Sequence, residues 1–89
     1  MGKTRKDRNY SFEHTKLRIL QRYNLRITLD AYNYLCHMIK NNINITLIDK
    51  EEQKNDVQSI YDLDLGLDGK IRVVWSNERN YITTALPRR

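Results

Sequence analysis

The chain has few of the residues that build disulfides, phosphate-binding loops and sharp breaks in secondary structure. Its 89 residues include one cysteine, one proline and three glycines. The single cysteine, Cys36, cannot form an internal disulfide, so a reducing compartment such as the cytoplasm is the simpler interpretation. The glycines form no glycine-rich phosphate loop, which argues against nucleotide-driven chemistry.

Membrane and metal signals are also missing. No apolar run approaches the roughly 20 residues of a membrane-spanning helix. Residues 1–8 are basic with no apolar segment behind them, so we expect no secretory signal. No Cys–His spacing matches a zinc site, and Asp62, Asp64 and Asp68 lack the calcium-loop pattern. We therefore expect no membrane association, no metal and no other cofactor.

Charge is distributed unevenly along the chain. Residues 1–26 carry eight Lys or Arg against two acids, residues 27–69 three against eight, and residues 70–89 five against one. If the basic ends meet in the fold, they form a surface that attracts nucleic-acid phosphates and releases counterions. Alternatively, the basic ends only screen the acidic middle and keep the protein in solution.

Two helices are predicted in the first half of the chain. Residues 1–9 are polar and basic and are expected to form a flexible arm. Ser11 is the expected N-cap of a helix over residues 12–23. Thr28 is the expected N-cap of a second helix over residues 29–41.

After residue 42 the hydrophobic period changes from that of a helix to that of a strand. The expected strands are residues 43–47, 57–65, 71–75 and 81–86. The charged residues 49–56 are expected to form a loop or hairpin tip, and Pro87 stops the last strand. The sequence thus predicts one α+β domain over residues 10–89, with two helices followed by a four-stranded antiparallel sheet.

The residues that point most clearly to chemistry lie in the first helix. His14, Arg18 and Arg22 recur every four residues, so they form one stripe along the helix. Histidine both takes and gives protons near neutral pH, and guanidinium groups bind phosphate oxygens in pairs. The stripe therefore suits a phosphate-handling surface, although a solvated helix face would have the same spacing.

Two further residues need an interpretation. Thr84 is expected on the same side of the last strand as Ile82 and Leu86, where its hydroxyl could orient a phosphate. The alternative is that threonine is simply a good strand former. His37 lies on the polar side of the second helix and is expected to be exposed and without a role.

The layout resembles the small ribonuclease toxins related to RelE and to colicin-type ribonucleases (the barnase–EndoU–colicin–RelE group). The resemblance rests on His14, Arg18 and Arg22 followed by Tyr-Asn-Leu, on the strand that ends in Val-Val-Trp75, and on the closing Thr-Thr-Ala-Leu-Pro87. It spans residues 12–87 in order.

This resemblance implies metal-independent RNA cleavage, in which a 2′-hydroxyl attacks the adjacent phosphorus and leaves a cyclic phosphate. His14 would be the general acid/base, Arg18 and Arg22 would bind the scissile phosphate, and Thr84 would help to position it. The other basic residues expected to contact RNA are Lys16, Lys70, Arg72 and Arg79. The expected partner is RNA, together with an antitoxin or host protein. The alternatives are a non-catalytic phage or mobile-element protein that inhibits a host protein, and a simple nucleic-acid binder.

Overall fold

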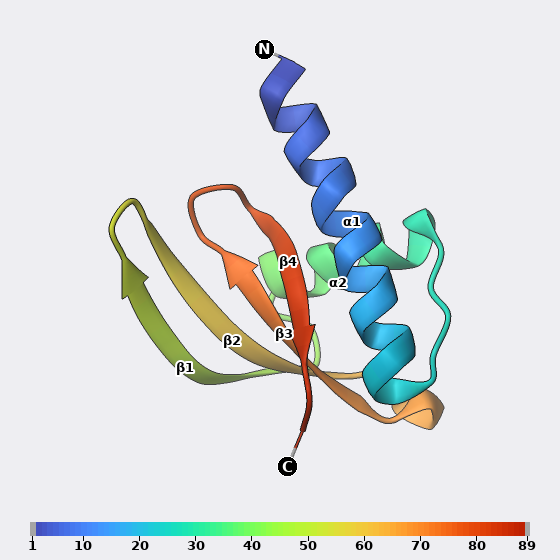
Figure 1. The fold of residues 1–89 in the computed structure, drawn as a ribbon. Coiled ribbons are helices and arrows are strands. Elements are labelled where there is room, and N and C mark those ends of the chain that lie inside the picture. The colour runs from blue at the N-terminus through green and yellow to red at the C-terminus, as the bar shows by residue number, and fades with distance from the viewer. Residues whose placement is uncertain (1, 89) are drawn as a thin grey trace.

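The fold consists of two helices and one antiparallel sheet (Figure 1). The computed structural model describes the backbone of residues 2–88 and the side chains of residues 8–88. The helices are α1 (Gly2–Tyr23) and α2 (Leu29–Lys40), and the strands are β1 (Ile45–Gln53), β2 (Asp56–Asp64), β3 (Lys70–Ser76) and β4 (Tyr81–Leu86). The strands lie in the order β1-β2-β3-β4, and the short 3-10 helix η1 (Gly66–Asp68) joins β2 to β3. The predicted α+β class is confirmed.

Helix α1 is longer than the sequence predicts. Residues 2–9 are its first turns rather than an arm, and Ser11 is buried inside the helix rather than at its N-cap. Lysine and arginine are good helix formers, so this basic segment can continue a helix. Near the end of this segment, Arg8 donates a hydrogen bond to Oδ1 of Asn33 on α2 over 2.7 Å. The helix ends at Tyr23, as predicted, and Asn24 follows it with a φ of 53°.

Helix α2 covers one face of the sheet. Its predicted N-cap is confirmed, because the N–H of Ala31 donates to Thr28 Oγ1 over 3.1 Å. The buried side chains of this helix are Tyr32, Leu35, Cys36, Met38 and Ile39. Tyr34 is exposed, because residues two apart such as Tyr32 and Tyr34 point to opposite sides of a helix.

The hydrophobic core lies between α2, one side of α1 and the sheet. On β3, Ile71, Val73 and Trp75 point into it, while Arg72 and Val74 point to the opposite face. The remaining buried members of the core are Ile19, Ile27, Tyr32, Leu35, Cys36, Met38, Ile39, Leu63, Tyr81, Ile82 and Ala85. We call the face of the sheet away from α2 the open face.

The hairpin of β1 and β2 extends farther than predicted. Residues 49–56 were expected to form a loop or hairpin tip, but β1 continues to Gln53 and β2 starts at Asp56, so the tip is shorter than expected. The prediction was wrong because these strand residues are polar and mostly exposed, so they show no apolar alternation. Their backbone groups pair with each other all the same, and only Lys54 and Asn55 form the turn.

Candidate functional site

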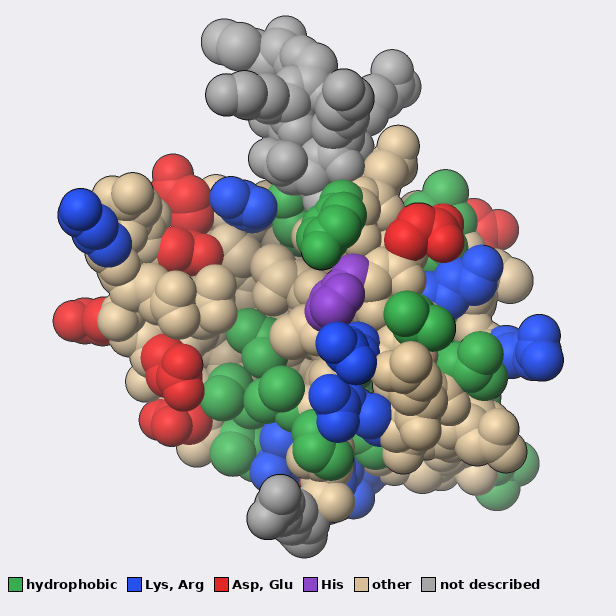
Figure 2. All heavy atoms as spheres, viewed as in Figure 1, with side chains coloured by type: hydrophobic (Ala, Val, Ile, Leu, Met, Phe, Trp, Pro, Cys, Tyr) green, Lys and Arg blue, Asp and Glu red, His purple; other side chains and the backbone are tan. Residues whose placement is uncertain are grey.

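The stripe predicted on α1 exists and lies beside the sheet. His14 and Arg18 are partly buried and Arg22 is exposed. Figure 2 shows a histidine side chain near the centre of one face with basic side chains directly below it. Because α1 runs along β4, a helix of the first basic segment and a strand of the last basic segment lie side by side (Figure 1).

Small residues let α1 approach β4 closely. Ser11, Thr15 and Ile19 recur every four residues and are all buried. Ser11 and Thr15 are short, so the helix backbone can lie close to the strand at that point. The N-terminal half of α1 and the β3–β4 turn therefore form two walls of one hollow.

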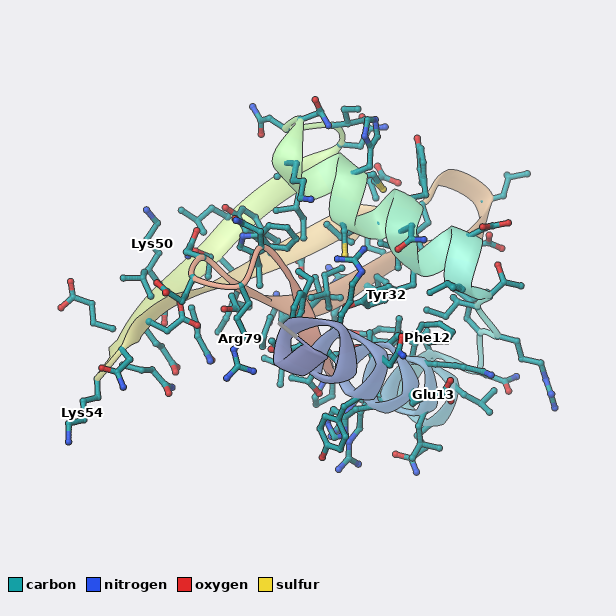
Figure 3. All side chains as sticks on the ribbon, turned by 90° about the horizontal axis from the view of Figure 1, so that it is seen from above. Phe12, Glu13, Tyr32, Lys50, Lys54 and Arg79 are labelled. Carbon is teal, nitrogen blue, oxygen red and sulfur yellow. The ribbon has the colours of Figure 1, made fainter. Side chains whose placement is uncertain are left out.

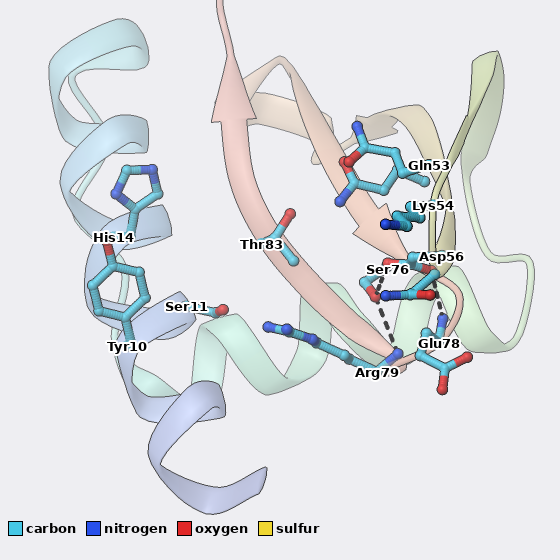
Figure 4. A pocket seen from close by; sticks show the side chains of 12 residues that line it. Tyr10, Ser11, His14, Gln53, Lys54, Asp56, Ser76, Glu78, Arg79 and Thr83 are labelled. Atoms are coloured by element: carbon cyan, nitrogen blue, oxygen red, sulfur yellow. Dashed lines mark hydrogen bonds between the residues drawn. The ribbon is translucent and has the colours of Figure 1, made fainter. Parts of the chain in front are cut away.

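This hollow, the His14 cleft, has a volume of about 590 Å³. It is open to solvent and lies between α1, β4, the β1–β2 turn and the β3–β4 turn (Figure 4). Its lining residues are Tyr10, Ser11, His14, Gln53, Lys54, Asn55, Asp56, Gln58, Ser76, Glu78, Arg79 and Thr83. Of the predicted site residues, the cleft brings together His14 and Arg79.

Of the two threonines of β4, Thr83 and not Thr84 lines this cleft with His14. The register skips one residue here, since Val74 pairs with Thr84 while Trp75 pairs with Ile82. Residues directly opposite each other share a face, so this bulge puts Ile82 on the core face and Thr84 on the open face. The expectation that Thr84 lies on the same side as Ile82 was wrong because a strand with a bulge does not alternate strictly.

An exposed aromatic ring lies at the mouth of the cleft. Tyr10 is 73% exposed and sits one turn before His14 on α1. The two rings are nearly parallel, with their centroids 6.0 Å apart. A flat, exposed ring of this kind can stack with a planar ligand group such as a nucleobase.

Acidic groups also line the cleft. Asp56 accepts hydrogen bonds from the Ser76 hydroxyl over 2.6 Å and from the Glu78 N–H over 2.9 Å. Burial acts to raise the pKa of Asp56, but these hydrogen bonds outweigh it and hold that pKa below its usual value. Asp56 therefore stays ionised and fixes the β3–β4 turn against the β1–β2 hairpin.

Arg79 is the cation best placed for a ligand in the cleft. Its N–H donates to the Ser76 hydroxyl over 3.0 Å, which fixes its backbone, and its side chain extends toward Ser11 (Figure 4). Seen from above, Arg79 lies between α1 and the β1–β2 hairpin, whereas Lys54 lies at the hairpin tip (Figure 3). The lysine and arginine that line the cleft, Lys54 and Arg79, thus both come from the sheet and not from α1.

The other residues predicted to bind RNA lie apart from the cleft. Lys16 is on another side of α1, with its Nζ 5.7 Å from the centre of the Phe12 ring. Lys70 begins β3 at the opposite end of the sheet from the β3–β4 turn. Arg72 is on the open face, where it is paired with Asp62. The structure therefore does not gather the four predicted residues on one surface.

The charge pair on the open face is a stabilising contact. Arg72 Nε donates to Asp62 Oδ1 over 2.8 Å, and Arg88 Nε lies 3.4 Å from Asp62 Oδ2. The hydrogen bond from Arg72, with the positive charge of both arginines, lowers the pKa of Asp62. The same pairing raises the pKa of Arg72.

Cys36 and His37 belong to different environments. Cys36 is buried, and burial raises the pKa of its thiol. His37 is exposed, as predicted, with its Nδ1 3.0 Å from Nδ2 of Asn41. Among the described residues, no three His, Cys, Asp or Glu side chains are grouped so that they could hold a metal ion.

Several residues that line the His14 cleft were not predicted from the sequence. Gln53 and Asp56 lie in the segment expected to be a loop, and Tyr10 lies at the boundary of the expected arm. Their only sequence signal is polarity, which does not distinguish a ligand site from a solvated turn. Thr83 could have been found only by anticipating the bulge.

Comparison with protein-family models, with curated proteins and with solved structures finds no match to this chain. The similarity to RelE-type toxins therefore stays a prediction from the motif residues. In the part of the chain that the structure describes, neither helix is both long and apolar enough to cross a membrane.

Proposed function

We propose that the His14 cleft binds RNA and cleaves it without a metal ion, with His14 as the proton carrier. The observation that carries this proposal is that His14 and Thr83 line one cleft. The Thr83 hydroxyl donates a long hydrogen bond of 3.4 Å to the Val74 carbonyl, and it can exchange that bond for one to a phosphate. A group that exchanges protons and a hydroxyl donor can then serve the same phosphodiester. Arg79 lines the cleft as well and supplies positive charge to the phosphate as negative charge develops on it.

The proposed reaction is an internal transfer at phosphorus. The 2′-oxygen attacks the adjacent phosphorus and gives its proton to a base, while the bond from phosphorus to the 5′-oxygen breaks and that oxygen takes up a proton. The products are a cyclic phosphate and a free 5′-hydroxyl. His14 supplies one of these two proton transfers, and the carboxylate of Glu78 is a candidate base for the other.

The surroundings of the cleft suit a single RNA strand. Tyr10 offers an exposed ring on which a base next to the scissile bond can stack. Arg18 and Arg22 continue the edge of α1 beyond His14 and can bind the following phosphates. One helix edge thus combines a stacking ring, a proton carrier and two cations.

The resemblance to RelE-type toxins supports the same roles for His14, Arg18 and Arg22. The positioning role that it implies for Thr84 passes in our proposal to Thr83, which lines the cleft. We also propose that the protein acts in the cytoplasm, where RNA is available and the lone thiol of Cys36 stays reduced.

The two histidines of the chain provide a matched test. We expect His14→Ala to lower the rate of cleavage of a fluorogenic single-stranded RNA by about 10²–10⁴-fold, the usual loss when a general acid or base is removed. His37→Ala, outside the cleft, should keep the wild-type rate. Circular dichroism should show that both variants are folded. An equal rate for His14→Ala and the wild type would refute the proposal.

A second candidate function is a non-catalytic module that binds another protein. It is favoured by the carboxylates of Asp56 and Glu78 inside the cleft, because negative charge at that place weakens phosphate binding. A protein segment that carries both charges would suit these acids together with Arg79. This candidate corresponds to the inhibitor of a host protein named above.

The same purified protein separates the two candidates. RNA that stays intact with the wild-type protein from pH 5 to 9, together with a stable complex recovered with a purified partner, would favour the second. Asp56→Asn and Glu78→Gln should then weaken that complex. In the RNA-cleaving protein, removing the Asp56 charge should instead strengthen RNA binding and make it more sensitive to salt.

A further inference from the structure

The β3–β4 turn carries two of the charged residues that line the His14 cleft. These are Glu78 and Arg79, and the whole turn, residues 77–80, is exposed to solvent. Exposed turns are commonly among the more mobile parts of a fold. The contacts that hold this turn in place therefore decide where the two charged side chains lie.

Hydrogen bonds tie the turn to the start of β2. The N–H and Nδ2 of Asn77 both donate to the Val57 carbonyl, over 3.1 and 2.6 Å. Nδ2 of Asn77 also donates to the Ser59 hydroxyl over 2.9 Å, and the N–H of Glu78 donates to Asp56 Oδ1 over 2.9 Å. These acceptors all lie on β2, so the first hairpin fixes the turn of the second.

Ser76, the last residue of β3, connects this network to Arg79. Its side chain is buried, with 1% exposed. The Ser76 hydroxyl donates a short bond of 2.6 Å to Asp56 Oδ2 and accepts from the Arg79 N–H over 3.0 Å (Figure 4). A hydroxyl that donates to a carboxylate becomes a better acceptor, so the two bonds strengthen each other. Ser76 thus links the ionised Asp56 to the backbone of Arg79.

We propose that Ser76 is a positioning residue for RNA cleavage, and that it acts by holding Arg79 at the cleft. This inference rests on the proposed function, in which Arg79 stabilises the negative charge that develops on the phosphate. Such stabilisation needs a cation that is in place before the reaction, and a displacement of about 1 Å can cost about 100-fold in rate. The Ser76 hydroxyl takes no part in the proton transfers, because its own proton is donated to Asp56.

Two buried serines of the same network provide a matched test in the full-length chain. With a fluorogenic single-stranded RNA, Ser76→Ala should lower kcat by about 10–100-fold and change KM by about threefold or less, because Arg79 acts mainly in the transition state. Ser59→Ala is the control, since Ser59 is 0% exposed and its hydroxyl accepts only from Asn77. It removes a bond of the turn but not the bond to Arg79, so it should keep the wild-type kcat. Urea denaturation should show similar losses of stability for both variants.

A double variant separates positioning from general damage to the fold. If Ser76 acts through Arg79, adding Ser76→Ala to Arg79→Ala should leave kcat where Arg79→Ala alone puts it. Losses of kcat that multiply in the double variant would overturn the inference, as would a Ser76→Ala variant whose kcat equals that of Ser59→Ala. Either result would leave the proposed function intact, provided that His14→Ala still abolishes cleavage. Wild-type protein that leaves RNA intact would instead remove the proposed function, and this inference with it.

Discussion

The two edges of the sheet are protected in opposite ways. At the β4 edge, α1 packs along the strand, and the residues of β4 are buried or partly buried. At the β1 edge no strand or helix of the described residues pairs, and eight of the nine residues of β1 are exposed. Unpaired edges invite association with other chains unless charges or bulges oppose it. Strand β1 has both, with a bulge at Ile48 and charged residues from Asp49 to Glu52.

The comparison shows how this chain makes room for a site. A helix that covers one edge of a curved sheet, and a hairpin that extends freely at the other, leave a hollow between them. His14 reaches this hollow from α1, and Asp56 reaches it from the hairpin. The covered edge provides rigid support, while the uncovered edge provides accessible polar groups.

The largest expected effect is a difference in the free energy of unfolding between a variant at the β4 edge and a variant at the β1 edge. Ile19→Ala should lower the free energy of unfolding by about 3 kcal/mol, because it leaves a cavity in the core beneath the covered edge. Ile48→Ala, at 42% exposure on β1, should cost less than about 1 kcal/mol. Urea denaturation followed by circular dichroism measures both. Equal losses would mean that α1 does not stabilise its edge as described.

A smaller effect should come from the contact that joins α1 to the sheet. The Tyr23 hydroxyl donates to the Leu86 carbonyl and accepts from the Arg72 N–H, so it bridges β3 and β4. Tyr23→Phe leaves both backbone groups without this partner and should cost about 1–3 kcal/mol. Tyr34→Phe is the control, because the exposed Tyr34 should give no measurable change in urea denaturation.

The smallest effect should depend on pH. It concerns the ion pair of Asp62 and Arg72, which joins the two central strands β2 and β3. The hydrogen bond from Arg72 is the main cause that lowers the pKa of Asp62 in the folded protein below its ordinary value of 3.8. The pair therefore stabilises the folded protein above pH 3.8, and this stabilisation is lost as the pH falls through the lowered pKa. Asp62→Asn should therefore cost about 1.5 kcal/mol at pH 7. Thermal unfolding at pH 7 and near pH 2 should show this difference and then its disappearance. A loss that persists at low pH would assign the effect to packing.

Local sequence patterns predicted much of the fold for physical reasons. Period and capping identified α2, because Thr28 satisfies a free N–H and the apolar residues recur at the helical spacing. The alternation in β3 placed Ile71 and Val73 correctly, since a central strand must bury one of its faces. The length of β1 could not be predicted, because its exposed residues need only a partner strand and no particular side chains.

The candidate site was predicted only in part. The spacing of His14, Arg18 and Arg22 requires a shared edge on any helix, so that arrangement follows from sequence alone. The partner of His14 across the cleft depends on the register between β3 and β4, where one bulge brings Thr83 to the cleft lining in place of Thr84. Such a register is set by packing among distant residues.

Capping, periodicity and spacing act over a few residues, so they were enough to predict the two helices, the four strands and the basic edge of α1. The packing of α1 along β4, and the cleft that Arg79 and Asp56 share with His14, appear only in the folded structure. Those arrangements depend on contacts between residues far apart in the chain, and short-range patterns carry no record of such contacts.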